Sequence, residues 1–152
     1  MKMEKILGMR PPRIAMGLLA LTVGLWHLSP QNTVLHVHYK LIGSICIMGG
    51  FIIMMWGWLL FRKVKTAICP TIRASALVTA GIFKISRNPM YLGMLMMLMG
   101  SSFLMGTIPS LFAPIAFFLI IDKVFIPYEE EKLVETFGAV YSDYAQKTRR
   151  WI

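Results

Sequence analysis

The chain has 152 residues, of which 57% are hydrophobic and only 15% charged, with a mean hydropathy of +0.64. This composition lies outside the range of soluble globular domains and predicts a membrane protein that forms one domain over residues 1–152. The formal net charge of +9 requires no nucleic-acid partner, because basic residues also gather in the cytoplasmic loops of membrane proteins and near anionic headgroups.

A bilayer-spanning helix needs roughly 20 mostly apolar residues, and three apolar blocks approach or exceed that length. They cover residues 14–28, 41–61 and 90–126. The third block is long enough to cross twice, and turn-forming residues interrupt it at 106–110. We therefore expect about four transmembrane helices, two in residues 1–65 and two in residues 66–152.

The basic start and the apolar stretch after it also fit a cleaved signal peptide. Pro11 and Pro12 precede the apolar stretch, and no small-residue cleavage site follows it, so we expect the first block to be a retained span. Lysine and arginine concentrate before this block and between the second and third blocks. The positive-inside rule places these segments, and with them both termini, in the cytoplasm.

Glycines recur every seven residues in three of the expected spans. Because seven residues are nearly two helical turns, each set lies on one face of its helix, where small residues allow close helix packing. We predict a packing seam at each set: Gly17 and Gly24; Gly43, Gly50 and Gly57; Gly93 and Gly100. The methionines around residues 90–99 are expected to face lipid or core, and a groove for a greasy substrate is the alternative.

No metal site is expected from the cysteines and histidines. Cys46 and Cys69 have neither disulfide nor zinc spacing. His36 and His38 are interpreted as residues at the membrane interface.

After Ile126 the sequence becomes amphipathic. Pro127 and a run of acids begin this segment, and Lys147, Arg149 and Arg150 end it, which matches the start and stop signals of a helix. We expect a cytoplasmic helical segment packed on the bundle and broken near Gly138.

Acidic residues are almost confined to this C-terminal part. Apart from Glu4, they are Asp122, Glu129, Glu130, Glu131, Glu135 and Asp143. Their natural counterpart is the sequence Arg87-Asn88-Pro89, where Asn is a good N-cap and Pro a good first helical residue. A helix that begins there presents N–H groups and a positive dipole end, and so forms an anion site. A capped helix with a snorkelling arginine is the structural alternative. The C-terminal acids and the basic helix start together suit a small zwitterionic molecule.

Two motifs carry a resemblance to a known family. "RNPMYLG" at residues 87–93 precedes an apolar hairpin, and "PYEEEKLVETFGAVYSDYAQKTRRW" follows it. Over residues 77–151 this pattern resembles the isoprenylcysteine carboxyl methyltransferase and phospholipid methyltransferase superfamily, in a bacterial-type form. The resemblance implies an integral enzyme of the inner membrane that uses S-adenosylmethionine and methylates a lipophilic acceptor at the cytoplasmic face. The acceptor and the oligomeric state stay open.

The resemblance also implies roles for particular residues. Tyr91, Glu129 and Glu130 are the expected catalytic residues. The expected cofactor-binding residues are Arg87, Asn88, Pro89, Tyr91, Gly93, Glu129, Glu130, Tyr141, Tyr144 and Arg149.

The chain departs from the prenylcysteine enzymes at two positions. Asn88 replaces their usual histidine, and Phe125 replaces an arginine, so that Lys123 is the nearest base. Two other functions remain as alternatives: a non-catalytic membrane interaction protein that keeps the fold, and a reductase-like relative.

Overall fold

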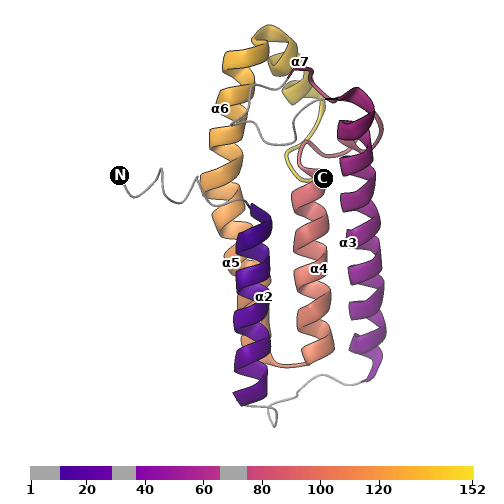
Figure 1. Cartoon of the computed structure of the whole chain (residues 1–152), viewed down its shortest axis with the longest axis vertical. Helices are drawn as coiled ribbons and strands as arrows, with labels where there is room; N and C mark the ends of the chain where they lie inside the picture. Colours follow the sequence, from indigo (N-terminus) through magenta and orange to yellow (C-terminus); the bar gives the residue numbers. More distant parts are fainter. Residues whose placement is uncertain (1–10, 29–36, 66–74) are drawn as a thin grey trace.

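The computed structural model describes residues 11–28, 37–65 and 75–152. Within these ranges all regular elements are helical, in agreement with the expected all-α class (Figure 1). The α-helices are α2 (Pro11–Leu28), α3 (Val37–Val64), α4 (Pro89–Met105), α5 (Phe112–Ile120), α6 (Ile126–Phe137) and α7 (Ala139–Lys147). The basic residues before Pro11, as well as His36, Cys69 and Arg73, lie outside the described residues.

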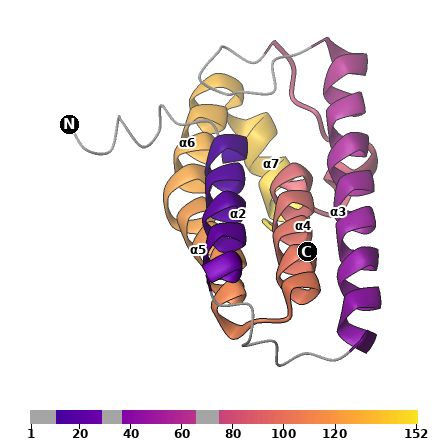
Figure 2. The same ribbon diagram turned by 60° about the horizontal axis from the view of Figure 1, so that its bottom comes forward.

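The long helices stand side by side as a bundle. Figures 1 and 2 show α3 along one side, α4 beside it, and α2 with α5 on the far side of α4. The helices α6 and α7 and the chain end gather at the end of the bundle where α4 begins (Figure 1).

Two helices are long and apolar enough to cross a membrane, Tyr39–Val64 and the continuous rod Ile108–Phe137. Helix α4 is apolar but has 17 residues, which corresponds to about 25 Å at 1.5 Å per residue. Large apolar side chains cover the outer surface of α3: Leu41, Ile42, Ile45, Met48, Phe51, Ile52 and Leu59 are exposed. A surface of this kind indicates a protein that lies in lipid. Of the four expected spans, two are thus supported by helix length and composition among the described residues.

The glycines of α3 and α4 form the predicted seam. A Cβ atom on Gly50 would lie 2.5 Å from the carbonyl oxygen of Gly93, and a Cβ on Gly43 would lie 2.7 Å from that of Gly100. At these positions the two backbones touch, and only glycine fits between them. Nothing lies within 4 Å of a Cβ on Gly17 or Gly24. The prediction of a seam in the first block is therefore wrong for the described residues.

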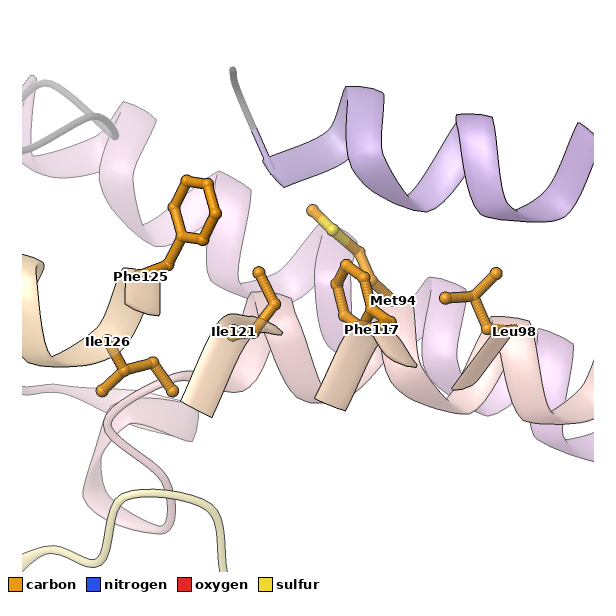
Figure 3. Close-up of a cluster of buried hydrophobic side chains, with 6 residues drawn as sticks. All are labelled: Met94, Leu98, Phe117, Ile121, Phe125 and Ile126. Atoms are coloured by element: carbon orange, nitrogen blue, oxygen red, sulfur yellow. The ribbon is translucent and has the colours of Figure 1, made fainter. Parts of the chain in front are cut away.

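The main hydrophobic core lies between α4 and the rod of α5 and α6. Its buried side chains are Met94, Leu98, Phe117, Ile121, Phe125 and Ile126 (Figure 3). Residues of α2, such as Leu18, pack against the cluster from one side. Met94 is thus a core residue, as the safer interpretation of the methionines predicted.

The hairpin between α4 and α5 closes where the sequence predicts a turn. Gly106 ends α4 in the left-handed conformation, with φ 69°, which favours glycine. Ser102 and Ser110 then hydrogen-bond across the turn, each hydroxyl donating to the other residue's carbonyl oxygen, at 2.7 and 3.0 Å. These contacts satisfy buried polar groups at this end of the hairpin.

The C-terminal helical segment is not separate from the last span. The rod continues from α5 through a π-helical turn, Ile121–Phe125, into α6 without a break at Pro127. The chain turns only at Gly138, whose φ of 54° ends α6 and begins α7, as predicted. Pro127 therefore lies inside the rod, directly after the π-helical turn, where the regular i to i−4 hydrogen bonding is already interrupted.

Candidate functional site

The two motifs meet at the end of the bundle where α4 begins. Arg87, just before α4, and Glu130, on α6, form an ion pair with 2.7 Å between Nη2 and Oε1. The two side chains keep 15% and 20% of their exposure. A charge-assisted hydrogen bond between partly buried groups is stronger than one in water. The pair therefore ties the start of α4 to α6.

A second contact runs parallel to the first. Tyr91 lies one helical turn after Arg87, and its hydroxyl donates to Oε1 of Glu129 at 2.6 Å. Arg87, just before α4, and Tyr91, in its first turn, thus present their polar ends to the two neighbouring acids of α6. These four residues, which the resemblance assigns to the cofactor site, therefore lie together.

The chain end completes the site. The segment after α7, here called the C-terminal segment (residues 148–152), lies beside the start of α4 and makes a parallel bridge between Ser86 and Arg149. The backbone N–H of Arg87 donates to the carbonyl of Arg149 at 2.9 Å, and Nδ2 of Asn88 donates to the carbonyl of Arg150 at 3.1 Å. Asn88 occupies the N-cap position, but its side chain makes no capping hydrogen bond. Its amide holds the C-terminal segment instead.

The arginine of the C-terminal segment that binds Glu130 is Arg150. Nη2 of Arg150 lies 2.7 Å from Oε2 of Glu130, so each carboxylate oxygen of Glu130 binds one arginine. Arg149 is exposed, and its side chain donates to the carbonyl of Ile152 at 3.5 Å. Neighbouring residues of an extended chain point to opposite sides, which is why one arginine faces the site while the other faces away. The resemblance assigned Arg149 to the pocket, whereas the structure brings Arg150 to Glu130.

The guanidinium of Arg87 retains an unused donor. Its Nη1 donates to the carbonyls of Ala145 and Thr148, at 2.6 and 3.1 Å. Its Nε is buried and has no hydrogen-bond partner among the described residues. An unsatisfied buried donor costs free energy, and a bound anion would satisfy it.

Two tyrosines of α7 line the same region. Tyr141 is 3% exposed, and its ring lies 6.1 Å from that of Tyr144. The Tyr144 hydroxyl donates to the carbonyl of Phe83 at 2.7 Å, away from the acids. Burial, and after it the negative charge of Glu130, raises the pKa of Tyr141 to about 12. Burial, and then the neighbouring Tyr141, also raises the pKa of Tyr144.

The raised pKa of Tyr141 predicts a loss of stability at high pH. The unfolded chain releases this proton near the ordinary pKa of 10.0, whereas the folded chain holds it up to about 12. The contribution is complete below pH 10 and is lost as pH rises toward 12, with a slope of about 1.4 kcal/mol per pH unit. Thermal unfolding of Tyr141→Phe in detergent should show a shallower decline than wild type. Tyr39→Phe, at an exposed position, is the control, and an unchanged decline in Tyr141→Phe would contradict the assignment.

Two further expected site residues lie in close packing contacts. Gly93 faces α3, where a Cβ would lie 2.5 Å from the carbonyl oxygen of Gly50. Pro89 is fully buried at the first position of α4. Lys123, the nearest base in the sequence to the replaced arginine, is 74% exposed and pairs with Asp122 at 3.0 Å. The basic residue that binds Glu130 from the C-terminal segment is Arg150. Among the described residues, no group of three potential metal ligands occurs.

Comparison with known proteins identifies a family. The model of the phospholipid methyltransferase family matches residues 38–140, more than half of the chain. The chain therefore belongs to this family of methyltransferases, as the motifs at both ends of the hairpin suggested.

Curated relatives match a shorter part of the chain. It is 38% identical to protein-S-isoprenylcysteine O-methyltransferase B of Arabidopsis thaliana over 74 residues, which cover 47% of this chain and 36% of the relative. Probable protein-S-isoprenylcysteine O-methyltransferases of Oryza sativa subsp. indica and subsp. japonica are 36% identical over 74 residues, 47% of this chain and 37% of each relative. The chain thus spans little more than a third of the length of these relatives. No solved structure matches it.

Proposed function

We propose that the protein is an S-adenosylmethionine-dependent methyltransferase that acts on a lipophilic acceptor at the cytoplasmic face of a membrane. The observation that carries the proposal is the pair of contacts between the motifs, Arg87 with Glu130 and Tyr91 with Glu129. They bring polar groups from residues about 40 positions apart to one end of an apolar bundle. A packing module would not need this concentration of charge, since buried ion pairs add little net stability.

The residues present fit the polar groups of the cofactor. S-adenosylmethionine carries a carboxylate, an ammonium group and ribose hydroxyls. Arg87, with its unused buried Nε donor, and Arg150 would hold the carboxylate. Glu129 and Glu130 would accept hydrogen bonds from the ammonium group or the hydroxyls. The tyrosine rings of α7 offer faces for a cation or an adenine base.

The bound cofactor would supply an electrophilic methyl group on its sulfonium. The protein would contribute alignment of the two reactants and exclusion of water, which account for much of the rate of such a transfer. A carboxylate acceptor needs no base. A thiol or amine acceptor must lose a proton, and Glu129, hydrogen-bonded to Tyr91, is the group placed to take it.

Calorimetry of the purified protein in nanodiscs, with S-adenosylmethionine as the titrant, tests the proposal directly. Incubation with a methyl-labelled cofactor then separates the acceptors. A farnesylated cysteine analogue represents the substrates in the names of the plant relatives, and an amine-bearing phospholipid represents the family name. Absence of cofactor binding would leave the non-catalytic interaction protein, and binding of a nicotinamide cofactor instead would support the reductase-like relative.

Tyr91→Phe is expected to lower methyl transfer by about tenfold, which corresponds to the loss of one hydrogen bond to a charged group. The substitution removes only the hydroxyl that binds Glu129, so the helix start and the ion pair of Arg87 remain. Initial rates at saturating acceptor provide the measurement. Tyr39→Phe is the matched control, because Tyr39 is exposed on α3. Rates equal to wild type for Tyr91→Phe would exclude a role for this hydroxyl.

A further inference from the structure

Asp122 is a buried acid that the proposed chemistry does not use. It lies in the π-helical turn between α5 and α6 and is 8% exposed. A buried carboxylate is costly unless it is paired and hydrogen-bonded. Its partners therefore indicate what it is for.

Two of these partners belong to the C-terminal segment. Nε1 of Trp151 donates to Oδ1 of Asp122 at 3.0 Å, and Nη1 of Arg150 lies 3.4 Å from the same oxygen. The Trp151 ring also packs on Phe118, with 5.2 Å between ring centroids. The third partner, Lys123, binds Oδ2 but is largely in solvent, and exposed ion pairs contribute little. The main contacts of Asp122 thus hold the chain end.

The π-helical turn explains why Asp122 and Glu130 reach the same arginine. Before the turn the buried positions follow helical spacing, Phe117 and Ile121, and across it both Phe125 and Ile126 are buried. The wider turn shifts the inward face by one residue. This shift lets Asp122 and Glu130, eight positions apart, both bind Arg150, through Nη1 and Nη2 respectively.

We propose that Asp122 is a positioning residue that anchors the C-terminal segment through Trp151 and Arg150, and so holds Arg150 against Glu130 in the cofactor site. The inference rests on the proposed function for its effect on the cofactor. The ion pairs form one series, Asp122–Arg150–Glu130–Arg87, in which Arg150 binds both acids and Glu130 binds both arginines. Without the Asp122 carboxylate, Arg150 keeps one acidic partner and Trp151 loses its acceptor. Asn88 then still donates to the carbonyl of Arg150, but the Arg150 side chain has lost its contact with Asp122.

The anchor itself is tested by ¹⁹F NMR of protein labelled with 5-fluorotryptophan, in which Trp151→Phe identifies the Trp151 signal. Asp122→Ala, which removes the acceptor of the Trp151 N–H, should shift and broaden this signal and speed amide exchange of residues 148–151 by about tenfold. Lys123→Ala, which removes only the exposed partner of Asp122, should leave both unchanged. An unshifted Trp151 signal with unchanged amide exchange in Asp122→Ala would overturn the anchor, whatever the cofactor does.

Coupling to the site is tested by a double-mutant cycle on S-adenosylmethionine affinity. Asp122→Asn and Arg150→Gln should each weaken binding by about fivefold to twentyfold, and the double variant should bind about as weakly as Arg150→Gln alone. Additive losses would show that Asp122 does not act through Arg150 and would overturn the positioning role. Where Asp122→Asn lowers the melting temperature, Trp151→Phe provides a second probe, because it removes only the N–H donor and an aromatic edge. Failure of wild type to bind the cofactor overturns the proposed function, and the NMR result still decides the anchor.

Discussion

Gly93→Ala is expected to destabilise the protein by about 1 to 3 kcal/mol, the range of overpacked core substitutions. The added methyl group would lie 2.5 Å from the carbonyl oxygen of Gly50 and 3.1 Å from the backbone nitrogen of Met54. Neither atom can rotate away, since both belong to the backbone of α3. The helices must therefore separate along the whole seam, including the contact of Gly43 with Gly100. Thermal unfolding in a fixed detergent measures the effect.

Gly17→Ala is the matched control for this prediction. It makes the same substitution within a helix, but nothing lies within 4 Å of the added atom. Alanine is favoured over glycine inside helices by roughly 0.5 to 1 kcal/mol, so this variant should be as stable as wild type or slightly more stable. If Gly93→Ala keeps wild-type stability and loses only cofactor binding, the assignment of Gly93 to packing is wrong and its sequence-based role in the site is supported.

Arg87→Ala is expected to weaken S-adenosylmethionine binding by about 1 to 3 kcal/mol, or fivefold to 150-fold. The change removes the ion pair with Glu130, two hydrogen bonds to the chain end and the unused Nε donor. Glu130→Ala should produce a loss of similar size, because it leaves Arg87 and Arg150 without their shared carboxylate. Calorimetry in nanodiscs provides both values.

Two other basic residues make the Arg87 experiment specific. Lys147→Ala removes an exposed charge at the end of α7 and should leave the affinity near that of wild type. Arg149→Ala distinguishes the sequence pattern from the structure: the pattern assigns Arg149 to the pocket, whereas the structure directs its side chain away. A loss for Arg149→Ala equal to that for Arg150→Gln would show that the observed placement of the two arginines is not the one that binds cofactor.

The helices of this protein were predictable because membrane-crossing helices require long apolar runs, and because glycine and proline often mark helix boundaries. The turn at Gly106, the start of α4 at Pro89 and the break at Gly138 all followed from local residue chemistry. The failure at Gly17 and Gly24 has a plain cause: glycine spacing marks a face that can pack closely, but not whether another helix lies against it. The π-helical turn was also missed, because helical spacing alone does not reveal one extra residue in a turn.

The sequence by itself determined the composition of the site: the acids stand almost entirely after residue 121, so any carboxylate site had to join them to a basic element such as Arg87. The tertiary structure alone decided which members of each cluster meet. Glu130 binds both arginines, Glu129 binds Tyr91, and Arg150 turns inward where Arg149 turns out. The reason is physical: adjacent identical residues have the same chemistry, and only the direction of each side chain in the folded backbone separates them.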